Sequence, residues 1–69
     1  MKLSARNQLK GTIVEVQEGA VNAIVKINVG NDNILTADIT VQSVKDLGLA
    51  VGKKVVAVIK STSVMVGVE

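Results

Sequence analysis

The chain has 69 residues, 48% of them hydrophobic, with no proline, cysteine, histidine, tryptophan, tyrosine or phenylalanine. It is therefore expected to form one domain, residues 1–69, that buries only about 60% of the surface its unfolded form exposes, so self-association is the expected route to stability. Without Cys or His, this chain lacks the residues for Cys or Ser-His nucleophilic catalysis, for imidazole acid–base catalysis and for zinc ligation by Cys or His. A net charge of +2 is too small to indicate a nucleic-acid-binding surface by itself.

A mostly β fold is indicated by 24 β-branched Val, Ile and Thr residues. The first predicted strand, Thr12–Gln17, places Val14 and Val16 on one face. After a short link containing glycine at 18–20, the odd positions of Val21–Val29 are all apolar, which predicts a second strand with one buried face. These two strands form a predicted hairpin.

The clearest turn is Gly30–Asn33, because Gly, Asn and Asp tolerate left-handed backbone. A third strand follows, in which Leu35, Ala37 and Ile39 face the core. The spacing then changes to three at Val41, Val44 and Leu47, which predicts one short helix. Thr40 or Ser43 would cap its start, and Gly48 would end it.

Two further strands, Val55–Ile59 and Val64–Val68, are predicted on either side of Lys60–Ser63. Their near-continuous apolar character favours burial on both faces. Five strands with one short helix before the fourth describe a small barrel like the oligonucleotide/oligosaccharide-binding (OB) fold.

Three polar clusters interrupt the apolar pattern: Ser4–Gln8, Thr40–Ser43 and Lys60–Ser63. All are rich in hydrogen-bond donors, and together they suit an anion. Taken one by one, each has an ordinary interpretation: solvated cations for Arg6 and Lys60, helix caps for Thr40 and Ser43, and a turn for the serine-rich run.

The motifs SARNQLKG at 4–11, EGAVNA at 18–23 and VIKSTSVM at 58–65 resemble the molbindins, small stand-alone Mop-type (TOBE-like) proteins that bind molybdate and tungstate. The resemblance extends over the whole chain. It implies a cytoplasmic protein that stores or buffers these oxyanions without catalysis, cofactor or bound metal cation. It also implies a homo-hexamer built as a trimer of dimers.

The resemblance further implies an oxyanion site between subunits. One chain would contribute Ser4, Arg6, Lys60 and Ser61, with main-chain contacts from Ala5 and Asn7. The neighbouring chain would contribute Thr40 and Ser43. The Ser61 position is commonly alanine in the family, which leaves open whether its hydroxyl or its backbone N–H contacts the ligand. A second site on the threefold axis would use Gly19, Ala20, Val21 and Asn22.

Two other functions stay open from the residues alone. An OB-like barrel can bind nucleic acid, although this chain has no aromatic side chain on which bases could stack. A purely regulatory oligomerisation module would share the fold and lack the donors. No apolar run approaches the roughly 20 residues of a membrane span, and the start of the chain lacks a signal-peptide core, so no membrane partner is expected.

Overall fold

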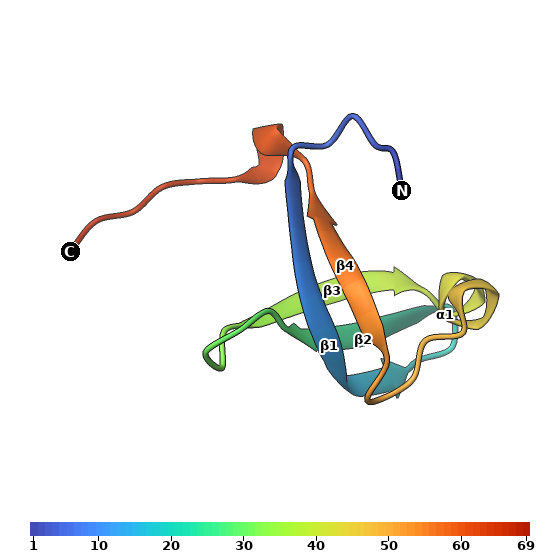
Figure 1. The fold of residues 1–69 in the computed structure, drawn as a ribbon. Helices are drawn as coiled ribbons and strands as arrows, with labels where there is room; N and C mark the ends of the chain where they lie inside the picture. The colour runs from blue at the N-terminus through green and yellow to red at the C-terminus, as the bar shows by residue number, and fades with distance from the viewer.

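Four antiparallel strands and one short helix form the structure, a computed structural model that describes residues 1–69. In chain order the elements are β1 (Asn7–Glu18), β2 (Asn22–Asn28), β3 (Ile34–Thr40), α1 (Val41–Leu47), β4 (Lys54–Ile59) and a 3₁₀ turn, η1 (Ser61–Ser63). The sheet order is β3-β2-β1-β4. The first half of β1 pairs with β4 and the second half with β2, so the sheet curls into a half-barrel (Figure 1).

A β-bulge in β1 sets which residues face the core. The register with β2 shifts between Ile13 and Glu15, which leaves Val14 as the extra residue. Ile13 is 1% exposed and Val16 packs against the core, whereas Val14 is 43% exposed. The prediction that Val14 and Val16 share one face was therefore wrong, because the bulge changes the alternation.

The core is small. Its six buried residues, all aliphatic, are Ile13, Ala23, Val25, Ile27, Val44 and Ala57. Three of them lie on β2, which confirms the predicted inward face of that strand, although Val21 precedes the strand and is exposed. The predicted inward residues of β3 are confirmed as half-buried. A core without aromatic rings leaves a large apolar area on the surface.

Helix α1 begins and ends where the sequence predicts. Thr40 is its N-cap and accepts a hydrogen bond from the Ser43 amide, while Gly48 ends it in the left-handed conformation at φ 62°. Lys53 Nζ donates to the carbonyl oxygens of Leu47 and Gly48, at 2.6 and 3.1 Å. Val44 anchors the helix in the core. No helix has the length and apolar character that crossing a membrane requires.

The predicted fifth strand, Val64–Val68, is absent, so the chain does not form a five-stranded barrel. After η1 the chain leaves the sheet and runs away from it (Figure 1), and it forms no ladder with any strand. Met65, Val66 and Val68 are more than 90% exposed. Strand propensity is not enough here, because no strand of the same chain lies within pairing distance.

Burial of β4 on both faces was also wrong. Ala57 is buried, but Val56 and Val58, which point the other way, are 37% and 45% exposed. Without a fifth strand, the half-barrel stays open between β3 and β4, and an apolar groove of about 790 Å³ lies there.

Candidate functional site

The first donor cluster lies at one end of the β1–β4 ladder. The last pair of that ladder is Asn7 opposite Ile59, so Arg6 and Lys60 are the next residues outward on their two strands. The chain segments before β1 and after β4 meet at this end (Figure 1). The structure therefore places at one end of the sheet the predicted residues Ser4, Ala5, Arg6, Asn7, Lys60 and Ser61.

The charges in this first cluster are uncompensated. Arg6 and Lys60 are exposed, and the only ion pair in residues 1–69 joins Lys26 Nζ and Glu15 Oε2, 3.9 Å apart. Gln8 Nε2 donates to the Ala5 carbonyl at 2.7 Å, which fixes the chain just before β1. Ser61 opens η1, and the first N–H groups of a helical turn have no acceptor within it, so the Ser61 amide is free to donate.

The second donor cluster is the start of α1. Thr40 Oγ1 accepts from the Ser43 amide at 3.0 Å and donates to Ser43 Oγ at 2.8 Å. The Thr40 hydroxyl therefore has both a donor and an acceptor partner within the helix start. The hydroxyl proton of Ser43 has no such partner and can be donated to a ligand.

The turn Gly19–Asn22, predicted as a second site, lies directly beside this helix start. The Val41 amide donates to the Val21 carbonyl at 2.8 Å, and Asn22 pairs with Thr40 across β2 and β3. Asn22 Nδ2 donates to Asp38 Oδ1 at 3.1 Å, so this side chain already has a carboxylate partner.

The two donor clusters lie at opposite ends of the molecule. β1 runs from Asn7 at the first cluster to Glu18 at the turn beside the second, and α1 packs mainly against β2 and β3 (Figure 1). One chain therefore does not bring the predicted donors together around a single ligand. A site that uses both clusters needs two copies of the chain.

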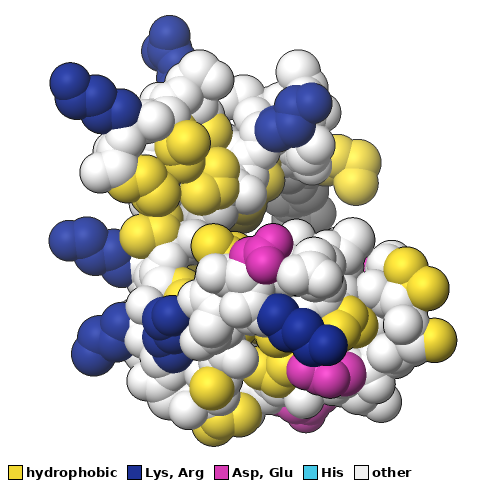
Figure 2. Space-filling model, turned by 90° about the vertical axis from the view of Figure 1, so that its right-hand side faces the viewer, with side chains coloured by type: hydrophobic (Ala, Val, Ile, Leu, Met, Phe, Trp, Pro, Cys, Tyr) yellow, Lys and Arg dark blue, Asp and Glu magenta, His cyan; other side chains and the backbone are white.

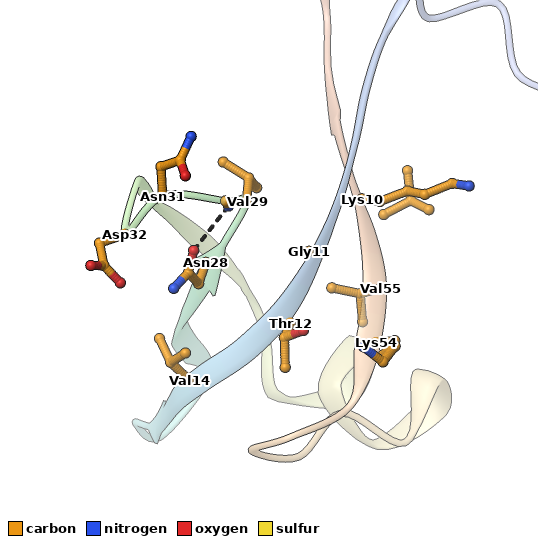
Figure 3. A pocket seen from close by; sticks show the side chains of 12 residues that line it. Lys10, Gly11, Thr12, Val14, Asn28, Val29, Asn31, Asp32, Lys54 and Val55 are labelled. Atoms are coloured by element: carbon orange, nitrogen blue, oxygen red, sulfur yellow. Dashed lines mark hydrogen bonds between the residues drawn. The ribbon is translucent and has the colours of Figure 1, made fainter.

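Sequence reasoning missed an open hollow of about 890 Å³ on the flank of β1 (Figure 3). Lys10, Thr12 and Lys54 line one side of it, and Asn28 at the end of β2 and Asp32 in the following turn line the other. Asn28 Oδ1 accepts from the Gly30 amide at 2.9 Å, drawn as a dashed line in Figure 3. In the sequence, polar residues at the alternate positions Lys10 and Thr12 indicate an outward face of this strand, and this pattern could have pointed to the hollow.

No group of three or more Asp, Glu, His or Cys side chains is placed to hold a metal cation. The chemistry that both clusters offer is hydrogen-bond donation, joined in the first cluster by two positive charges. Such an arrangement suits a small anion, whose oxygens accept from N–H and O–H groups.

The comparisons with known proteins all indicate the same family. The probable molybdenum-pterin-binding protein of Haemophilus influenzae is 56% identical over 69 residues, which is all of both chains. The structure of a molybdate-binding protein from Sporomusa ovata superposes with a TM-score of 0.89 at 41% identity, covering 96% of this chain and 97% of that one.

A third relative is the cytoplasmic molybdate-binding protein ModG with molybdate bound, which superposes with a TM-score of 0.83 at 52% identity. The match covers 88% of this chain and 43% of ModG. The family model of the TOBE domain matches residues 3–66. This chain therefore belongs to the TOBE-domain family, and its resemblance to the molbindins is confirmed.

Proposed function

We propose that the chain, as a single domain of residues 1–69, binds molybdate or tungstate reversibly and stores or buffers it in the cytoplasm. The observation that carries the proposal is the division of the donors into two clusters at opposite ends of one chain. Two copies that pack these ends together complete a site around one oxyanion.

In such a site Arg6 and Lys60 supply the charge. A dianion between subunits must be matched by nearby positive charge, and neither cation has an acidic partner within its own chain. Ser4, Ser61 and backbone N–H groups add donors from the same chain. Ser43 adds a hydroxyl from the neighbour, oriented by its bond with Thr40. The free Ser61 amide favours a main-chain contact at that position.

The relatives support the ligand. The Sporomusa ovata protein and ModG are described as molybdate-binding, and ModG as cytoplasmic. The Haemophilus influenzae protein is described as molybdenum-pterin-binding. Donor-only clusters favour the bare oxyanion for this chain, since a pterin ring also presents N–H groups that need acceptors. No cofactor takes part in the proposed function.

Two apolar features support self-association as a hexamer, a trimer of dimers. The groove between β3 and β4 is lined almost wholly by hydrophobic residues and has two unpaired strand edges. The segment Val64–Val68 is apolar, exposed and unpaired. Exposure of this apolar surface to water is unfavourable, and a second copy of the chain would remove that exposure by covering both features.

A second oxyanion site on Gly19–Asn22 remains part of the proposal. This turn lies next to the start of α1. Three copies arranged around a threefold axis would bring three of these turns together. The bond from Asn22 to Asp38 places a carboxylate beside this site. Because this carboxylate repels anions, the second site would bind a dianion less tightly than the first site.

The proposed role is binding without catalysis, since no Cys or His is available as nucleophile or base and the clusters contain no carboxylate base. Nucleic-acid binding is the competing function for a fold of this kind. An increase in the fluorescence anisotropy of a labelled single-stranded oligonucleotide, on addition of micromolar protein, would favour that alternative.

Calorimetric titration with molybdate, tungstate, sulfate and phosphate in parallel tests the proposal. We expect molybdate and tungstate to bind with similar affinity, sulfate far less, and the stoichiometry per chain to reveal the classes of site. Sedimentation of the same samples gives the number of copies. A protein that binds none of the four anions would refute the proposed function.

A further inference from the structure

One face of the β1–β4 ribbon carries two lysines and no acidic residue. On β1, Gln8, Lys10 and Thr12 point to the same side, because alternate residues of a strand share a face. Their ladder partners are Val58, Val56 and Lys54. The opposite face of the ribbon carries the buried residues Ile13 and Ala57, so this one is the outward face.

This outward face leads to the first donor cluster. Arg6 and Lys60 follow directly after the last ladder pair, and Lys10 and Lys54 lie further along the same ribbon. At about 3.4 Å per residue, Lys10 is about 14 Å from Arg6, and Lys54, opposite Thr12, is about 20 Å away. Figure 3 shows Lys10 projecting outward, away from Asn28 and Asp32.

The ribbon carries no acidic residue. The segments 1–14 and 49–68 contain six of the eight Lys and Arg and none of the six Asp and Glu, whereas five of the acids lie in 15–48. None of Lys10, Lys54, Arg6 and Lys60 has an ion-pair partner. Figure 2 shows Lys and Arg side chains gathered along one margin of the molecule, with most acidic side chains away from it.

We propose that Lys10 and Lys54 form an electrostatic approach to the oxyanion site, one that speeds the capture of dianions without holding them. The inference rests on the proposed function. Separated charges act on a diffusing ion through the solvent, so they raise the association rate constant. They lie too far from the bound ion to donate hydrogen bonds to it, so the dissociation rate constant is left almost unchanged.

The size of the effect follows from Coulomb's law with screening. For a dianion in water at about 10 mM ionic strength, where the Debye length is about 30 Å, Lys10→Glu should lower the association rate constant about threefold and Lys54→Glu about twofold. The double variant should lower it about sevenfold. At about 150 mM, where the Debye length is about 8 Å, each single effect should shrink to less than about 1.5-fold.

The experiment measures uptake and release of radiolabelled molybdate by rapid filtration, since the chain has no aromatic residue for intrinsic fluorescence. The matched controls are Lys10→Arg and Lys54→Arg, which change the same side chains and keep their charge. Each control should leave the association rate constant within about 1.5-fold of the parent value. Sedimentation and circular dichroism confirm that each variant keeps the parent assembly and fold.

The outcomes separate the two proposals. A parent protein that binds no molybdate refutes the proposed function, and this inference falls with it. If the parent binds molybdate but the Lys→Glu variants have the same association rate constant as the parent or as the Lys→Arg controls, only the approach role is overturned. Faster dissociation as the main effect would also overturn it, because Lys10 and Lys54 would then belong to the binding site itself.

Discussion

Thr40 and Ser43 hold each other at the start of α1 through two hydrogen bonds of opposite direction. Thr40 Oγ1 accepts from the Ser43 amide at 3.0 Å and donates to the Ser43 hydroxyl at 2.8 Å. Thr40 therefore stabilises the helix, and Ser43 has a hydroxyl proton left for a ligand. The two residues have different roles, although both are simple hydroxyl residues at a helix start.

Substitutions should separate these roles. Thr40→Ala removes the N-cap and should lower the free energy of unfolding by about 1 kcal/mol, while Thr40→Ser should keep most of it. Ser43→Ala keeps the main-chain bond to Thr40, so stability should stay close to that of the parent. Molybdate binding should nevertheless weaken about 10- to 150-fold, since a hydrogen bond to a charged group contributes about 1.5–3 kcal/mol.

Urea unfolding at one fixed protein concentration measures the first effect, and calorimetric titration the second. If Ser43→Ala binds molybdate as tightly as the parent, the neighbour's helix start takes no part in the site.

Removing either positive charge of the first cluster should weaken binding strongly. Arg6→Ala and Lys60→Ala should each raise the dissociation constant for molybdate at least tenfold, because the dianion loses a charge-assisted hydrogen bond. Both residues are exposed, so the assembly should persist in sedimentation. Lys26→Ala serves as the control. Parent-like affinity in both cluster variants would move the site elsewhere, with Gly19–Asn22 as the next candidate.

Elements specified by local signals were predictable from the sequence, and elements that depend on distant partners were not. Helix α1 follows from the spacing of Val41 and Val44 between a capping Thr40 and Gly48. The inward face of β2 follows from the apolar residues at every odd position of 21–29. Nothing local marks Val14 as a bulge, because that shift depends on how β1 must bend to pair with both β2 and β4.

Dependence on a distant partner also explains the error at Val64–Val68. This segment has the propensity of a strand, but no strand of the same chain pairs with it. For the site, the motifs identified the donors. Only the structure shows that Arg6 and Lys60 continue one ladder while Thr40 lies at the far end.

The close approach of β1 to the end of β2 depends on Gly11. A Cβ at Gly11 would lie 2.6 Å from Ile27 Cγ2 and 2.7 Å from the Asn28 carbonyl oxygen. Since backbone must then move, Gly11→Ala should lower the free energy of unfolding by about 1–3 kcal/mol. Gln17→Ala, at an exposed position of the same strand, is the control. Equal stability of the two variants in urea would contradict the close approach.

The exposed C-terminal segment should hold the assembly together. Val66→Lys places a charge in an apolar run that is 91% exposed in the single chain. If a second copy covers this run, the charge must be desolvated, and the sedimentation coefficient should fall toward that of smaller species. Asn33→Lys, in the exposed turn before β3, adds the same charge and should leave the assembly intact. Val66→Lys with the parent sedimentation coefficient would show that the segment is free.

The final prediction concerns which anions are rejected, and how pH changes this. The proposed ligands Arg6, Lys60, Ser43 and the backbone N–H groups include no carboxylate, so a bound anion finds donors and few acceptors. Near neutral pH phosphate carries a proton that needs an acceptor. Burying an unmatched donor costs about 1–3 kcal/mol, enough to weaken phosphate binding roughly 5- to 150-fold.

Sulfate has no proton at this pH, so only its shorter bonds set it apart from molybdate. Raising the pH from 6 to 8.5 removes one of the two protons that phosphate carries at pH 6, which leaves a dianion with a single proton, and it leaves sulfate unchanged. Phosphate should therefore gain relative to sulfate in competition with labelled molybdate. If phosphate competes as well as molybdate already at pH 6, an acceptor lines the pocket. Asp38, hydrogen-bonded to Asn22 beside the second cluster, is the carboxylate to replace first, by Asn.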